Sequence, residues 1–402
     1  MPKPEILFLA HRIPYPPDKG DKIRSWRMLS HLAAQFDVHL GCFVDDPADM
    51  EHADFLRTIT KSAAFIPVHP MIARLKCLPA LVSGRPLSFA YFNDGRMGAY
   101  VKKVRKLPLA AEVAFSSSMA PYLARPVKGR ARIVDLCDAD SEKWREYAET
   151  ARGLMKGVYA LEAERLADAE TRIINWADET LAISAPEARI LGSHEGATKT
   201  VGCFANGVDA EFFSSDAAMP DNFQTFDVVF VGAMDYRANA EAALWFAHYV
   251  WPLVREKSPG ATFGIIGPRP GAPIKMLDGR NGVTVTGRVE DVRPYIRNAG
   301  AAVAPLRVAR GVQNKVLEAM AMARPVVATS GAHEGIEAIA GEEIVVADAP
   351  GAFADAVSLL LADRARGDSI GAAARARVVA DFTWPARLGE LDAALVRAGV
   401  RF

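Results

Sequence analysis

A short segment near residue 315 carries a glycine, a lysine and a glutamate at spacings that suit an anion. In "RGVQNKVLEAMAMARPVVAT" (310–329), Gly311, Lys315 and Glu318 follow one another at intervals of four and three residues, so a helix would place them on one face. Free N–H groups and the dipole at the start of such a helix favour negative charge. Gly311 permits close approach, Lys315 adds a cation, and Glu318 can accept hydrogen bonds from two neighbouring ribose hydroxyls. The segment predicts a nucleoside diphosphate site; the alternative is a Lys–Glu pair on a surface helix.

A second candidate ligand loop lies near the N-terminus, in "YPPDKGDKIRSW" (15–26). Gly20 and the amino end of the helix expected after Asp21 can face a diphosphate or an acceptor. The alternative is a helix capped by Asp21, with Lys and Arg side chains in solvent.

Three carboxylates follow an apolar run in "DLCDADSEKW" (135–144). Asp135, Asp138 and Asp140 could ligate a divalent cation if their oxygens converged. We favour binding of acceptor hydroxyls, with helix capping as the alternative, and expect Asp138 to take part in catalysis.

Short apolar runs alternate with helical periodicity, which predicts the elements that position these residues. This alternation predicts parallel sheets covered by helices on both faces, and its restart after "NGVD" (206–209) predicts two such domains. Ligands bind beyond the carboxyl ends of parallel strands, so a cleft between the domains is the expected site. The expected strands of the first half are 5–10, 38–44, 64–68, 112–117, 132–137 and 179–184, and the expected helical segments there include 22–36 and 142–177.

The bulk composition excludes some classes of protein. The 402 residues include 48 Lys and Arg and 48 Asp and Glu, so net charge gives no reason to expect a nucleic acid partner. Cys42, Cys77, Cys137 and Cys203 form no CxxC pair and are expected to be reduced, buried thiols. The N-terminus lacks the apolar run of a signal peptide, and no segment approaches the ~20 apolar residues of a spanning helix. We therefore expect a cytoplasmic protein.

Residues 71–106 mix Arg and Lys with Leu and Phe, as in "MIARLKCLPALVSGRPLSF" and "YVKKVRK". Such a mixture suits the interface of an anionic membrane, so peripheral contact with the inner face of the plasma membrane is expected. The alternative is a helix packed on the first domain with a basic outer face.

"KVLEAMAMARPVVAT" resembles the "LEAMAxGxPVVAT" segment of retaining family-4 glycosyltransferases with the GT-B fold. This resemblance implies an α/β protein of two Rossmann-like parallel-sheet domains, 1–205 and 206–382, facing across a cleft, with a last helix (383–402) that returns to the first domain. The sequence of 15–26 and 135–144 is closest to a subgroup linked to exopolysaccharide and exosortase (PEP-CTERM) systems. Further segments that agree in order are "NGVD", "VFVGAM" (229–234), "IIGPRP" (265–270), "VTVTGRVEDVRPYIRNAGAAVAPLR" (283–307) and "DFTWPARLGELDAALVRA" (381–398).

The resemblance implies a metal-independent glycosyltransferase of the hexosyltransferase type, without a cofactor. It would move a sugar from a nucleoside diphosphate sugar to a polysaccharide or lipid-linked acceptor. Glu318 matches the family's ribose-binding glutamate, whereas Arg310 replaces the glutamate that touches the transferred sugar. Arg237 alone remains of the family's Arg/Lys pair, so Lys315 would share the neutralisation of the phosphates. The expected donor-binding residues are Gly20, Gly232, Arg237, Gly311, Lys315 and Glu318, and the expected catalytic residues are Arg310, Lys315 and Asp138.

Two other functions remain open on the sequence alone. A sugar-nucleotide epimerase of related architecture needs acid and base groups, for which His11, Asp138 and His333 are available. The replacement at Arg310 also fits a nucleotide-sugar-binding module without activity, because fold does not determine function.

Overall fold

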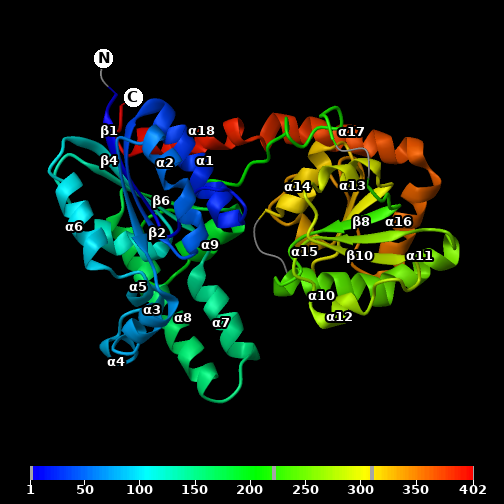
Figure 1. Ribbon diagram of the computed structural model, residues 1–402, viewed down its shortest axis with the longest axis horizontal. Coiled ribbons are helices and arrows are strands. Elements are labelled where there is room, and N and C mark those ends of the chain that lie inside the picture. The colour runs from blue at the N-terminus through cyan, green and yellow to red at the C-terminus, as the bar shows by residue number, and fades with distance from the viewer. Residues whose placement is uncertain (1–2, 220–222, 308–311, 402) are drawn as a thin grey trace. The chain divides into compact units, whose positions relative to one another are not determined.

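The chain folds into two compact units, each built on one parallel sheet (Figure 1). The computed structural model describes residues 3–219, 223–307 and 312–401. The first unit comprises Met1–Ala205 and Leu388–Phe402, and the second comprises Asn206–Arg387. The expected pair of Rossmann-like parallel-sheet domains is confirmed.

The first unit contains a seven-stranded sheet in the order β3-β2-β1-β4-β5-β6-β7, with every neighbouring pair parallel. Leu7, Leu9 and Val134 are fully buried, because helices cover both faces of the sheet and leave the strands no polar side. The strands are β1 Glu5–Ala10, β2 Asp37–Val44, β3 Ser62–Pro67, β4 Leu109–Phe115, β5 Ala131–Cys137, β6 Glu179–Ala182 and β7 Gly202–Cys203.

Between these strands the chain forms nine α-helices and two short 3-10 helices within the described residues. The α-helices are α1 Gly20–Gln35, α2 Ala53–Ile59, α3 Pro70–Cys77, α4 Ala80–Ser83, α5 Leu87–Tyr91, α6 Gly95–Val104, α7 Asp140–Thr150, α8 Leu154–Trp176 and α9 Ala185–Gly192; the 3-10 helices are η1 Pro47–His52 and η2 Ser117–Leu123.

The expected continuous helical stretch 142–177 is wrong. Gly153 has a positive φ of 62° and precedes the first turn of α8, so the chain turns between α7 and α8. The two helices pack against each other as a hairpin that extends from the lower end of the first unit in Figure 1.

The second unit contains a six-stranded parallel sheet in the order β10-β9-β8-β11-β12-β13. Helices α10 and α12 lie along one side of this sheet and α13 and α14 along the other (Figure 1). The strands are β8 Val228–Val231, β9 Phe263–Ile266, β10 Val283–Gly287, β11 Ala301–Ala304, β12 Val326–Ala328 and β13 Val345–Val346. The helices are α10 Arg237–Trp245, a π-helical turn Phe246–Val250, α11 Trp251–Lys257, α12 Ala272–Lys275, α13 Arg293–Asn298, α14 Asn314–Ala321, α15 Ser330–His333, α16 Pro350–Ala362 and α17 Arg364–Asp381.

The last helix, α18 Trp384–Arg397, returns to the first unit as expected. His31 of α1 lies 2.7 Å from the Asp392 carboxylate, and Arg397 donates to Glu179 of β6 at 2.8 Å. These polar contacts join the end of the chain to the first sheet and its helices.

The four cysteines are not all buried. Cys42 is buried in β2, whereas Cys203 is exposed, so the expectation of four buried thiols is wrong for Cys203. Within the residues that the structure describes, no helix combines the length and the apolar content needed to cross a bilayer.

Candidate functional site

Helix α14 presents Lys315 and Glu318 at the carboxyl edge of the second sheet. It begins at Asn314, after the segment that leaves the carboxyl end of β11. Both side chains are half-buried, and the Lys315 ammonium lies 3.3 Å from the side-chain oxygen of Gln313 and 6.0 Å from the centre of the Phe230 ring. The face carrying these residues is therefore partly open to solvent, as a ligand-binding face must be. Arg310 and Gly311 lie outside the described residues.

Burial shifts the pKa values of both charged groups towards neutral pH. It lowers the pKa of Lys315 to about 8 and raises the pKa of Glu318 to about 7, while the attraction between the two groups opposes each shift. A cation and a carboxylate held in partly desolvated positions gain more from a charged ligand than they would in water. The pair therefore suits a diphosphate near Lys315 and a pair of hydroxyls near Glu318.

Two asparagine oxygens near this edge have no hydrogen-bond partner within the described part of the chain. They are Oδ1 of Asn314, the first residue of α14, and Oδ1 of Asn239 in the first turn of α10. A buried acceptor without a donor is costly, so each marks a place where a ligand or water can donate a hydrogen bond. The sequence reasoning missed both residues, although an asparagine at a helix start is itself a signal for a polar contact.

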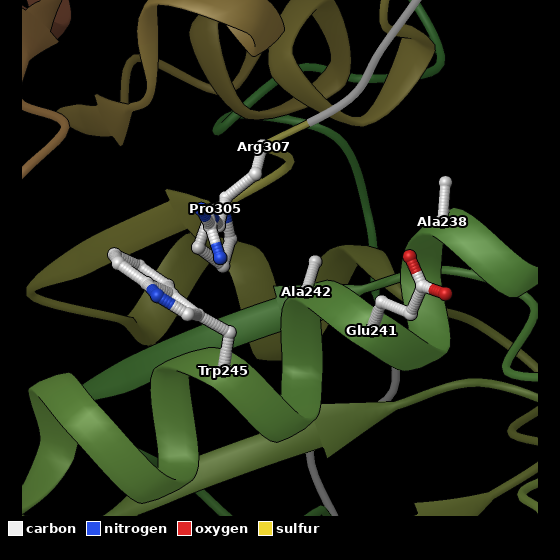
Figure 2. A pocket seen from close by; sticks show the side chains of 6 residues that line it. All are labelled: Ala238, Glu241, Ala242, Trp245, Pro305 and Arg307. Carbon is white, nitrogen blue, oxygen red and sulfur yellow. The ribbon is translucent and has the colours of Figure 1, made fainter.

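A cavity of about 430 Å³ lies between α10 and the segment that follows β11 (Figure 2). Trp245 and Glu241 line it from α10, and Pro305 and Arg307 line it from the other side. Its volume falls within the range of small-molecule sites. An aromatic ring with a guanidinium and a carboxylate could hold a polar ligand, and none of these residues was predicted from the sequence.

Arg237, an expected donor-binding residue, is the first residue of α10 and directly precedes Ala238, which lines the cavity. It is exposed and donates to Glu241 at 2.6 Å. An exposed pair of this kind contributes little to stability, so its Arg can be recruited by a more highly charged ligand at small cost.

Gly232 directly follows β8, and its structural setting explains why it is a glycine. A Cβ atom there would approach Nδ2 of Asn239 to 2.8 Å. Gly267, which follows β9, has φ of 144°, and a Cβ there would meet the carbonyl oxygen of Gly232 at 1.9 Å. The two strand ends pack so closely that neither position has room for a side chain, and only the backbone of Gly232 can contact a ligand.

In the first unit, α1 begins at Gly20, which is exposed and has open space beside it. The residue before it, Lys19, makes no side-chain cap, and Asp21 instead accepts a hydrogen bond from Arg12 at 2.7 Å. The alternative of an Asp21 cap is therefore wrong. The first N–H groups of α1 have no acceptor within the helix and remain suited to an anion.

The other part of that alternative, solvated Lys and Arg side chains after Gly20, is also wrong for two residues. Lys22 is buried and lies 3.1 Å from the Asp49 carboxylate. Arg24 is fully buried, donates to Asp135 at 2.7 and 3.1 Å, and lies over the Phe204 ring. Arg24 holds α1 against β5 and Lys22 holds it against η1, so both cations are engaged in structure.

The three aspartates after β5 have separate surroundings. Asp135 is bound to Arg24, and Asp140 accepts from the Ser117 hydroxyl at 2.8 Å. Asp138 is half-buried, and burial together with repulsion from Glu187 and Asp140 raises its pKa to about 6. No group of three or more His, Cys, Asp or Glu side chains in the described ranges is placed to hold a metal ion. Asp138 thus has the properties of a proton acceptor near neutral pH.

Two buried glutamates that the sequence reasoning missed support this loop. Glu170 of α8 accepts from the backbone N–H and the hydroxyl of Ser141, and Glu187 of α9 accepts from the N–H of Ala139 at 2.7 Å. They fix the backbone on either side of Asp140. Their sequence distance from the loop, 29 and 48 residues, left no local signal.

The two histidines considered as acid–base candidates differ in their contacts. His11 follows β1, its Nε2 lies 3.3 Å from Asp21, and its Nδ1 is buried without a partner among the described residues. His333 in α15 bonds through Nε2 to the carbonyl oxygen of Ala338 at 2.8 Å. His11 thus lies at the carboxyl edge of the first sheet, whereas His333 supports its own turn.

The comparisons agree with this architecture. Residues 225–363 match the family model described as glycosyl transferases group 1. The structure is similar to that of Anabaena Alr3699/HepE in complex with UDP, with 14% identity, a TM-score of 0.66 and coverage of 98% of this chain and 99% of that one. It is also similar to sucrose-phosphate synthase from Thermosynechococcus elongatus, with 17% identity, a TM-score of 0.68 and coverage of 98% and 100%.

A third similar structure is WaaG, a glycosyltransferase involved in lipopolysaccharide biosynthesis, with 13% identity, a TM-score of 0.64 and coverage of 98% and 100%. No curated protein sequence matches the chain. The matched segment contains α10, the cavity, Lys315 and Glu318. Residues 225–363 therefore match the glycosyl transferases of group 1, and the two parallel-sheet units have the GT-B fold; together these findings support a glycosyltransferase.

Proposed function

We propose that the protein transfers a sugar, with retention of configuration, from a nucleoside diphosphate sugar to a glycan or lipid-linked acceptor. The observation that carries the proposal is the half-buried Lys315–Glu318 pair at the carboxyl edge of the second sheet, within the segment that matches the group 1 family. Solved structures of the same fold include complexes with UDP and with UDP-glucose. A uridine diphosphate sugar is therefore the first donor to test.

Different residues hold the ribose and the diphosphate of the donor. Glu318 accepts hydrogen bonds from the ribose hydroxyls, and Lys315, with Arg237 and Arg310, neutralises the phosphates. Gly20, Gly232 and Gly311 contribute backbone groups rather than side chains. The asparagine oxygen of Asn314 gains a donor from the bound nucleotide sugar.

The transfer step breaks the bond between the anomeric carbon and the diphosphate oxygen and forms a bond from that carbon to the acceptor hydroxyl. Attack from the same face retains configuration, and the departing phosphate oxygen takes the acceptor proton. Charge accumulates on the diphosphate, so Lys315 and the cationic side chains near it stabilise the transition state more than the ground state. No metal ion is required in this scheme.

The acceptor is positioned by the loop after β5. Asp138, whose pKa is raised to about 6, accepts a hydrogen bond from an acceptor hydroxyl and orients it. The resemblance of 15–26 and 135–144 to exopolysaccharide-associated transferases supports an acceptor in exopolysaccharide synthesis, presented at the inner membrane surface.

The test is transfer by the purified protein from a panel of nucleoside diphosphate sugars, with mass spectrometry of the products and NMR of the new linkage. Wild type should release the nucleoside diphosphate and form an α-linkage from an α-linked donor. Glu318→Ala should bind UDP at least about tenfold more weakly, because a charge-assisted hydrogen bond contributes about 1.5–3 kcal/mol. Normal UDP binding by Glu318→Ala would exclude the proposed role of α14.

The same assay separates transfer from epimerisation. Incubation with donor alone should give slow hydrolysis and an unchanged sugar. An isomerised sugar nucleotide would contradict the transferase proposal and favour acid–base chemistry at His11. Binding without turnover across the whole panel would identify a nucleotide-sugar-binding module instead.

A further inference from the structure

The segment containing α3 and α4 exposes its large apolar side chains. Met71, Ile72, Leu75, Leu78 and Val82 are between 53% and 90% exposed. Met71, Leu75 and Leu78 follow at intervals of four and three residues and so share one face of α3 and its extension. Isolated exposed apolar residues are ordinary on a soluble protein, but five within twelve residues form a patch that requires an explanation.

This segment buries its small side chains and exposes its large apolar ones, whereas an ordinary surface helix does the opposite. The residues at its buried positions have small side chains. Ala73 and Ala80 are 4% and 3% exposed, and Cys77 is half-buried with its thiol near the Leu87 carbonyl. An ordinary amphipathic helix buries its large apolar residues and exposes its small or polar ones. Here the large side chains form the outer face, which we name the α3–α4 patch (Met71, Ile72, Leu75, Leu78 and Val82).

Polar contacts from α8 fix the backbone of α4 and of the start of α5, which follows it. The buried Glu162 carboxylate accepts from the backbone N–H groups of Leu87 and Ser88 at 2.6 and 2.9 Å. The Arg165 guanidinium donates to the carbonyl oxygens of Ala80 and Leu81 at 2.7 and 2.8 Å. Anchored through its backbone in this way, the segment does not need its large side chains for attachment to the unit.

The charged residues within the patch's own segment are all cationic. The 25 residues from 69 to 93 contain Arg74, Lys76 and Arg85 and no Asp or Glu. Arg74 is exposed and makes no ion pair within the ranges that the structure describes, whereas Lys76 lies 3.6 Å from Asp94. Apolar side chains beside unpaired cations are complementary to an anionic lipid surface, where burial and electrostatic attraction add.

The tip of the α7–α8 hairpin carries a second, smaller group of the same composition. Leu154 and Met155 are exposed there, between the exposed cations Arg152 and Lys156. Figure 1 shows the tip and α4 at the same end of the first unit.

We propose that the α3–α4 patch inserts into the interface of an anionic bilayer, with the hairpin tip as a second contact. The apolar side chains enter the boundary between head groups and acyl chains, and Arg74 and Lys156 lie against the lipid phosphates. The inference deepens the proposed function, on which its link to a lipid-linked acceptor rests. Binding to lipid is measurable without any transfer reaction.

The test is cosedimentation of the full chain with vesicles. Wild type should bind phosphatidylcholine vesicles containing about a quarter phosphatidylglycerol at least about tenfold more tightly than phosphatidylcholine alone, and salt should weaken that binding. The triple variant Met71→Ser, Leu75→Ser, Leu78→Ser should lose at least about tenfold in partitioning. Arg74→Gln should lose about fivefold on anionic vesicles only.

The matched control replaces three exposed apolar residues of the second unit, Met276→Ser, Leu359→Ser and Val379→Ser. This variant should partition like wild type, and both triple variants should keep the wild-type thermal shift with UDP. The proposal is overturned if wild type shows no preference for anionic vesicles, or if the patch variant binds them as well as the control. If UDP does not raise the melting temperature of wild type, the donor assignment is contradicted, whereas the vesicle result is unaffected.

Discussion

Lys315 and Glu318 lie three residues apart on α14, and burial shifts both of their pKa values towards neutrality, to about 8 and about 7. The two groups are therefore both ionised only within a narrow range of pH. Below that range the carboxylate is protonated and loses one acceptor for ribose hydroxyls. Above it the ammonium is neutral and no longer attracts the phosphates.

Affinity for a nucleotide sugar should follow a bell-shaped dependence on pH with its maximum between about 7 and 8. Affinity rises as Glu318 deprotonates and falls as Lys315 deprotonates. Isothermal titration with a UDP-sugar between pH 6 and pH 9, in steps of about half a unit, measures this directly, because the diphosphate of the intact donor keeps a constant charge. Glu318→Gln should abolish the acidic limb and Lys315→Met the basic limb; a flat profile for wild type would contradict the roles of both.

Gly20→Ala should separate ligand contact from folding. A Cβ at Gly20 meets no atom within 4 Å, and the residue opens α1 at an exposed position, so the free energy of unfolding should change by less than about 0.5 kcal/mol. If the backbone of Gly20 approaches the diphosphate, the added methyl group should reduce kcat/KM at least about tenfold. Gly98→Ala, inside α6 and also with open space beside it, is the control: it should leave kcat/KM unchanged and raise the free energy of unfolding by at most about 1 kcal/mol. Equal kinetics for the two variants would remove Gly20 from the donor site.

The strands and the doubly covered sheets could be predicted from the sequence because short apolar runs between turn signals are typical of strands buried on both faces. The expected strand 5–10 is β1 itself, and the restart near residue 206 coincides with the change of sheet. The break at Gly153 was missed because a single glycine in an Ala- and Glu-rich stretch also occurs inside helices.

The buried charges could not be predicted in the same way. Lys22 and Arg24 appear as solvated cations in the sequence, since their carboxylate partners Asp49 and Asp135 are 27 and 111 residues away. Asn239 and Asn314 have no local pattern that distinguishes an amide whose buried oxygen lacks a partner among the described residues from a surface amide. Side-chain pairing across the sheet is a property of the tertiary structure, whereas the face shared by Lys315 and Glu318 follows from helix geometry alone.

Glu170 should make stability depend on pH. Burial raises its pKa from 4.5 to about 8, so the folded protein holds a proton that the unfolded chain releases above pH 4.5. The stabilising contribution is complete below the unfolded value and is lost as pH rises towards 8, with a slope of up to about 1.4 kcal/mol per pH unit. Urea unfolding between pH 5 and pH 8 should therefore show a steeper loss for wild type than for Glu170→Gln. Glu164→Gln, at an exposed position of the same helix, should keep the wild-type slope, and a shared slope for all three proteins would contradict the shifted pKa.

The pair formed by Arg24 and Asp135 fixes the start of α1, because Arg24 lies one turn after Gly20 and reaches β5 across the sheet. Asp135→Asn leaves a fully buried guanidinium without its counter-charge. The free energy of unfolding should fall by about 3–5 kcal/mol, measured by urea denaturation. Replacing both members, Arg24→Met with Asp135→Leu, should recover much of this loss, since two apolar side chains need no partner there.

The exposed pair Arg57–Asp54 provides the control for this cycle. Asp54→Asn should cost less than about 1 kcal/mol, because solvent screens an ion pair at the surface. If Asp135→Asn costs no more than Asp54→Asn, the buried pair does not hold α1. The start of that helix, and with it the backbone of Gly20, would then be positioned by the Lys22–Asp49 pair and by the packing of the apolar face of α1.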